Sequence, residues 1–170
     1  MRSLMRLFRS EPAAARPLYE QVVARARQPH WYLAGAVPDT LEGRFSVLAT
    51  LLALVDVRLE RGGDLARRTS VGLAECFVAD MEIENRQLGV SDTGIGKKVG
   101  SLVGALGGRV GVWRRVVDGE ESWEGGVSRS VYRNTEAAGE ALAHVERELR
   151  AFWAALQART DEALVHGALP

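Results

Sequence analysis

One helical face in the last third of the chain constrains the fold more than any other feature of the sequence. Its apolar residues recur at intervals of three or four and form one stripe: Ala138, Leu142, Val145, Leu149, Phe152 and Leu156. The charged residues of the same segment lie largely off this stripe, as in a helix that packs one side onto a core. We therefore predict a long final helix from about residue 135 to 159.

Shorter stripes of the same period predict earlier helices, each bounded by proline, glycine or a capping residue. Asp39 stands three residues before Glu42, which resembles a capping box with Asp in place of Ser or Thr. Four earlier helices are predicted, each given by its first and last boundary residue: Pro17 to Pro29, Asp39 to Gly62, Asp64 to Gly89, and Ser91 or Asp92 to Gly107.

Two segments interrupt this pattern. Gly107 and Gly108 separate the fourth helix from residues 109–117, and residues 118–134 are rich in Gly, Ser, Glu and Arg, which predicts a loop or short irregular arm. Strand-like alternation is nearly absent, and 170 residues are the usual size of one domain. The predicted fold is all-α, a compact single-domain helical bundle with a short irregular arm.

The N-terminus differs in composition from the rest of the chain. We predict a flexible basic tail over residues 1–11 and a helical domain over residues 12–170. The tail alternates arginine with apolar residues, so peripheral contact with an anionic membrane and a loosely docked terminus both stay open. No apolar run approaches the ~20 residues of a membrane span, and no signal-peptide pattern follows, so a cytoplasmic location is expected.

Charge and cysteine content exclude several functional classes. The 22 basic and 22 acidic residues balance, so no overall field favours nucleic acid, and we predict no nucleic-acid partner. Cys76 is the only cysteine, so an internal disulfide is excluded. Its apolar neighbours predict a small buried residue.

No segment has the spacing of a catalytic, nucleotide or metal site. The segment Gly94–Gly100 lacks the glycine spacing of a phosphate-binding loop. Asp80, Glu82 and Glu84 could suggest a divalent metal site. On a helix, however, Asp80 and Glu84 share a face and Glu82 points elsewhere, so the three carboxylates do not converge. The three histidines, none beside a nucleophile signature, are His30, His144 and His166. We predict no catalytic residue, metal or cofactor, and a protein that is not an enzyme.

Two pairs of residues are candidates for binding. Lys97 and Lys98 are the only lysines, and they fall in early turns of a helix where the macrodipole does not favour a cation. A solvated face and a contact surface both account for them. Trp31 and Tyr32 follow a proline, and either anchor their loop to the core or offer aromatic contacts to a partner.

Several motifs in the middle of the chain resemble those of the ubiquinol-cytochrome c chaperone family. The first, residues 37–45, is a Pro-Asp-Thr turn leading into a Gly-Arg-Phe helix start. It is followed in order by residues 80–81, 86–92 and 96–99, and by the pair Gly108-Arg109. Two departures are Gln87, where a glutamate is common, and Leu106-Gly107, where aromatic residues are expected.

The resemblance implies a chaperone of complex III assembly that binds newly made cytochrome b. It also implies a small co-chaperone, by analogy with mitochondrial relatives, and a position on the inner membrane (the matrix side if eukaryotic). The arginine-rich composition suggests a bacterial protein. A general helical interaction module with an unrelated partner is the alternative.

We predict that a basic patch beside aromatic residues binds the partner. In the competing interpretation, Arg44 or Arg86 pairs with a nearby aspartate and braces the fold. The predicted partner-binding residues are Trp31, Tyr32, Asp39, Arg44, Arg86, Asp92, Lys97, Lys98 and Arg109.

Overall fold

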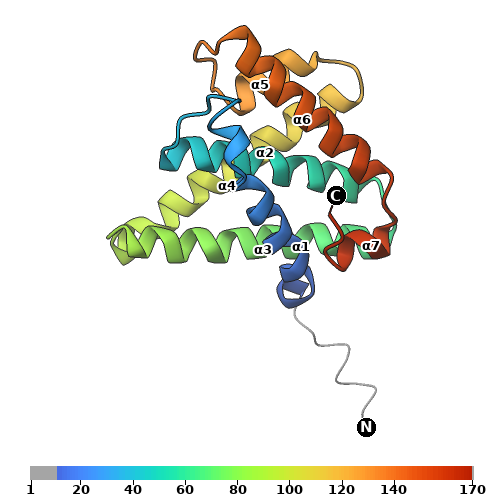
Figure 1. Cartoon of the computed structure of the whole chain (residues 1–170). Helices are drawn as coiled ribbons and strands as arrows, with labels where there is room; N and C mark the ends of the chain where they lie inside the picture. Colours follow the sequence, from blue (N-terminus) through green and yellow to red (C-terminus); the bar gives the residue numbers. More distant parts are fainter. Residues whose placement is uncertain (1–10, 170) are drawn as a thin grey trace.

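The computed structural model describes residues 11–169, and this range contains seven α-helices, one short 3-10 helix and no strand (Figure 1). The all-α prediction is confirmed. The elements are α1 Glu11–Ala26, η1 Pro29–Trp31, α2 Leu41–Glu60, α3 Asp64–Gln87, α4 Asp92–Val117, α5 Trp123–Ser130, α6 Gly139–Gln157 and α7 Asp161–Val165. The predicted basic tail lies outside the described residues except for Glu11, so its division from the domain stays a prediction.

Helix α2 forms the centre of the molecule. It contacts α1, α3, α4, α5 and α6, and residues 51–55 are all at most 3% exposed. Figure 1 shows α1 crossing α2 and α3, with α5 and α6 gathered at the other side of α2. A helix that is apolar around its whole circumference must be covered on all sides, which explains this central position.

Helix α1 packs along α3. The predicted burial of Cys76 is confirmed, and its thiol donates to the Pro12 carbonyl at 3.2 Å. Arg16 donates to Asp80 at 3.0 Å one turn further along both helices. The sequence predicts that the first helix starts at Pro17. This boundary is wrong, because α1 begins at Glu11 and Pro17 lies inside it.

Two other boundaries differ from the sequence prediction. Helix α4 continues through Gly107 and Gly108, because Val110 and Trp113 in its second half are held in the core. Residues 123–130 form α5 where a loop was expected, since Ser122 caps the helix by accepting from the amide of Gly125 at 3.0 Å.

The predicted final helix is confirmed in its main part. Leu149, Phe152 and Leu156 are buried, and Leu142 is partly buried against the core. The helix α6 ends at Gln157, and Thr160 then caps the short α7 by accepting from the amide of Ala163 at 3.2 Å. None of the helices in residues 11–169 combines the length and apolar character that a membrane span requires.

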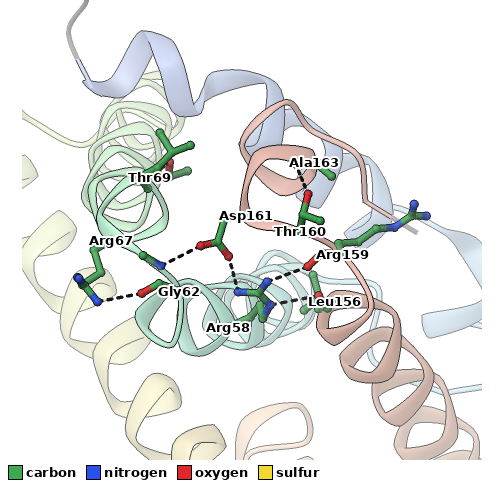
Figure 2. Close-up of polar contacts among 11 residues, drawn as sticks. Arg58, Gly62, Arg67, Thr69, Leu156, Arg159, Thr160, Asp161 and Ala163 are labelled. Atoms are coloured by element: carbon green, nitrogen blue, oxygen red, sulfur yellow. Dashed lines mark hydrogen bonds and ion pairs between the residues drawn. The ribbon is translucent and has the colours of Figure 1, made fainter.

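A polar clamp holds the C-terminal elements on the domain (Figure 2). Arg58 of α2 donates to the carbonyl oxygens of Leu156 at 3.2 Å and Arg159 at 2.8 Å, and to the Asp161 carboxylate at 2.9 Å. The second oxygen of Asp161 accepts from the amide of Gly63 at 2.8 Å. This amide and the guanidinium lower the pKa of Asp161. The clamp joins α2, the α2–α3 turn and both ends of the α6–α7 connection.

We expect alanine at Gly100 or Gly104 of α4 to stabilise the fold. Both positions are exposed, and an added Cβ would meet no atom within 4 Å. Because glycine costs about 1 kcal/mol relative to alanine inside a helix, each change should raise the free energy of unfolding by up to about that amount in urea titrations. The control is Gly126→Ala, whose Cβ would lie 2.7 Å from Val116 Cγ2 and should destabilise. A loss of stability in the α4 variants would contradict the prediction.

Candidate functional site

A groove of about 860 Å³ lies between the second half of α1, the loop after it, the start of α2 and the last turns of α3. Its floor is largely apolar, and charged groups stand at intervals along its edge. It is lined by Tyr19, Val23, Ala26, Arg27, Pro29, Tyr32, Leu33, Asp39, Leu41, Arg44, Phe45, Leu48, Asp80, Met81, Ile83, Glu84 and Gln87.

The turn before α2 shapes one end of the groove. Thr40, and not the predicted Asp39, is the N-cap, because its hydroxyl accepts from the amide of Gly43 at 3.1 Å. Asp39 instead accepts from Arg44 Nε at 2.6 Å. A Cβ on Gly43 would lie 1.8 Å from the Pro38 carbonyl oxygen, so only glycine lets the turn fold back over the helix start.

The edge of the groove exposes large apolar side chains. Leu33 is 77% exposed, Leu41 56% and Ile83 54%. These residues come from the loop, from the start of α2 and from α3, so they surround the opening. Contiguous exposed apolar surface rimmed by polar groups is typical of a protein-binding site.

A buried polar group lies at the base of the groove. Tyr19 is 1% exposed, and its hydroxyl has no hydrogen-bond partner of good geometry among the described residues. Burial, reinforced by the nearby Asp80 carboxylate, raises the pKa of Tyr19, so its hydroxyl stays protonated. Asp80 itself is held by Arg16. The hydroxyl is therefore enclosed beside Asp80 at the base of the groove.

Both aromatic residues of the loop anchor it to α1. Trp31 is 2% exposed, and its indole donates to the carbonyl of Arg25 at 2.9 Å. Tyr32 donates to the carbonyl of Ala26 at 2.9 Å, but its ring remains half-buried at the groove. Core anchoring is thus confirmed for Trp31, whose indole has no surface to offer a partner, whereas Tyr32 both anchors the loop and lines the groove.

Arg109 also faces inward. Its guanidinium donates to the Ser130 carbonyl at 3.0 Å, to the Ala105 carbonyl at 3.1 Å and to the Ser46 hydroxyl at 3.2 Å, and it stacks over the ring of Phe45 at 5.4 Å. Burial lowers its pKa. These contacts brace α2, α4 and α5, and they leave Arg109 outside the groove lining.

The other predicted residues lie at the α3–α4 turn and on α4. Arg44 pairs with Asp39 at 2.6 Å, as the competing interpretation expects. Arg86 and Asp92 approach only to 4.0 Å and are 55% and 95% exposed, so partner binding and bracing of the fold both stay predictions for Arg86. Lys97 and Lys98 are exposed in the first turns of α4. Of the predicted set, the groove brings together Tyr32, Asp39 and Arg44.

The sequence interpretation missed the apolar edge. The edge residues lie close in the sequence to predicted site residues, as Leu33 does to Tyr32. An isolated apolar residue in a sequence, however, does not indicate whether its side chain is exposed. The available signal was the position of Leu33 and Leu41 in a polar turn region, off any helical stripe.

The structure is thus that of a small helical protein with an open, apolar-edged groove. The chain belongs to the ubiquinol-cytochrome C chaperone family, whose model matches residues 34–169. Membership of a chaperone family implies a protein that is not an enzyme.

The chain is also similar to a solved structure, the Cbp3 homolog from Brucella abortus. The two are 27% identical, with a TM-score of 0.81, and the similarity covers 98% of this chain and 94% of the other. It therefore includes α1, which precedes the family match. No curated protein matches the chain.

Proposed function

We propose that this protein is an assembly chaperone of ubiquinol-cytochrome c reductase (complex III), and that it binds cytochrome b through the groove between α1, α2 and α3. Family membership supports the assembly role. The observation that carries the binding site is the exposed apolar edge of Leu33, Leu41 and Ile83 around a groove of about 860 Å³.

The groove suits a segment of a membrane protein that has not yet reached its final partners. Its apolar floor would cover side chains that water disfavours, at about 25 cal/mol per Å² buried. The exposed ion pair of Arg44 and Asp39 at its edge would meet the polar groups of the same segment. A binding task of this kind needs no cofactor.

The location and any further partner belong to the same proposal. The protein would act in the cytoplasm or peripherally at the inner membrane, where Lys97 and Lys98 supply exposed positive charge towards anionic lipid. A small co-chaperone is a further proposed partner.

The test is capture of cytochrome b and assembly of complex III in cells that make this protein. We expect cytochrome b to co-purify with the tagged chain, and deletion of the gene to lower assembled complex III. If deletion leaves complex III intact, the chaperone proposal gives way to a general helical interaction module.

A charge-reversed variant tests the lysine pair within the same experiment. Because both side chains are exposed, Lys97→Glu with Lys98→Glu should change the free energy of unfolding by no more than about 0.5 kcal/mol. It should still weaken co-purification with cytochrome b and lower complex III, because the lysines lie outside the groove and would hold the protein at the membrane that contains its client. Wild-type capture and assembly by the folded double variant would show that the lysines are only solvated.

A further inference from the structure

Two histidines that are far apart in the sequence form a hydrogen-bonded pair beside the groove. His30 Nδ1 and His144 Nε2 lie 3.1 Å apart, and the rings meet edge to face with centroids 5.3 Å apart. His30 belongs to η1 and His144 to α6. The outer nitrogens are also occupied: His30 Nε2 lies 3.1 Å from Gln28 Oε1, and His144 Nδ1 lies 3.2 Å from Arg147 Nη2.

The hydrogen bonds are all satisfied only when both rings are neutral. Arg147 can only donate, so Nδ1 of His144 accepts and its Nε2 carries the hydrogen. His30 Nδ1 therefore accepts from His144, and its Nε2 donates to Gln28. A first proton on His144 Nδ1 would cost only the contact with Arg147 and would leave the bond between the rings intact. With both rings protonated, His30 Nδ1–H would face His144 Nε2–H, and the bond between the rings would break.

The surroundings add to the cost of a second positive charge. Arg25 of α1 and Arg147 of α6 are both near the pair, and Glu148 is the one carboxylate among the described groups that favours a charged His30. Burial is the main cause that lowers the pKa of His30, and His144 and Arg25 lower it further.

The pair joins the loop that walls the groove to α6. The residue before His30, Pro29, lines the groove, and so do Tyr32 and Leu33 shortly after it. Beyond them, the Gly35 carbonyl accepts from the Tyr132 hydroxyl, and a Cβ on Gly35 would lie 2.8 Å from Val145 Cγ2. The loop thus lies directly against α6 at Val145, the residue next to His144.

We propose that the His30–His144 pair is a pH-sensitive latch that keeps the groove wall in place and releases it when both rings are protonated. The release of a bound client rests on the proposed function, but opening of the loop does not. Because the closed loop binds the second proton less readily than the open loop, opening is favoured as pH falls below the ordinary histidine value of 6.5.

The experiment follows the histidines and the loop in the full-length protein, with no client present. The histidine side chains are titrated by NMR, and exchange of the Gly35 and Val37 amides is measured between about pH 7.5 and about pH 5.5, after correction for the intrinsic effect of pH. These amides donate within the loop, to His30 at 2.9 Å and Trp31 at 3.1 Å. We expect His30 to titrate below the ordinary histidine value of 6.5. The ratio of open to closed loop should increase at most about tenfold for each unit by which the pKa for the second proton is lower in the closed loop than in the open loop.

Two matched variants separate the latch from other acid effects. In His144→Gln, the amide does not titrate and can turn to donate to His30 or accept from it, so loop exchange should lose most of its dependence on pH. In His166→Gln, the change is at the exposed end of α7, so the dependence should remain. If His30 titrates at or above the ordinary histidine value of 6.5, or if acid opens the loop equally in wild type and His144→Gln, the latch is wrong.

A final arm measures capture of cytochrome b at the same two pH values. Weaker capture in acid by the wild type, but not by His144→Gln, supports client release. Failure to capture at either pH overturns the proposed function and leaves the titration result standing. Equal capture at both values, with the loop open in acid, overturns the release step.

Discussion

Replacing Arg58 with alanine should lower the free energy of unfolding by about 3 kcal/mol. The Arg58 side chain is only 14% exposed and holds two carbonyl oxygens and the Asp161 carboxylate. Removal of the guanidinium would leave these acceptors without their donor in a largely covered site. Urea unfolding of the purified variant measures the loss, and local exchange should rise first in α7.

A surface ion pair on the same turn provides the control. Arg67 donates to Asp64 and to the Gly62 carbonyl, but Arg67 and Asp64 are 56% and 82% exposed. Arg67→Ala should therefore cost no more than about 1 kcal/mol. Equal effects of the Arg58 and Arg67 substitutions would show that the clamp does not hold α7 on the domain.

Acid should weaken the same clamp. The pKa of Asp161 is lowered below its ordinary value of 3.8, first by the Gly63 amide and then by Arg58. Its contribution to stability is therefore complete above that value and is lost as pH falls through the lowered pKa. Asp161→Asn should remove this part of the pH dependence.

The paired substitution Leu33→Asp and Ile83→Asp should reduce capture of cytochrome b at least about tenfold. The two side chains line the groove from different elements, the loop after α1 and helix α3, and are 77% and 54% exposed. Carboxylates at these positions would have to be desolvated when an apolar segment binds. Capture from cells, quantified against wild type at equal expression, measures the effect.

The fold itself should tolerate this double variant. Surface substitutions usually change stability by no more than about 0.5 kcal/mol, so thermal unfolding should be close to that of the wild type. The matched control is Val71→Asp on α3, where the side chain is 52% exposed but does not line the groove. Undiminished capture by the groove variant, or an equal loss in Val71→Asp, would rule out the groove as the client site.

Several features follow from local sequence, because they depend on residues within a few turns of one another. The stripe from Leu142 to Leu156 predicts α6, since apolar residues at helical spacing can share only one face. The near-absence of alternation predicts an all-α fold. The motif at residues 37–45 indicates the family because its parts contact one another within a few residues. The cap is Thr40, and Gly43 packs against the turn at Pro38.

Other features needed the folded chain. Gly107 and Gly108 have weak helix propensity, yet α4 continues through them because its second half packs into the core. Trp31 and Arg109 could be assigned to a surface or to the interior only once their partners on other elements were known. A side chain's exposure depends on contacts that local pattern does not encode.

The sequence by itself determined the helical class, the family and the positions of most helices, because each depends on short-range periodicity and local motifs. Only the tertiary structure decided where the groove lies and that His30 meets His144. The groove joins residues from Tyr19 to Gln87, and the histidine pair spans 114 positions in the chain. Such sites arise when buried apolar faces dock the helices, so the sum of many long-range contacts places them.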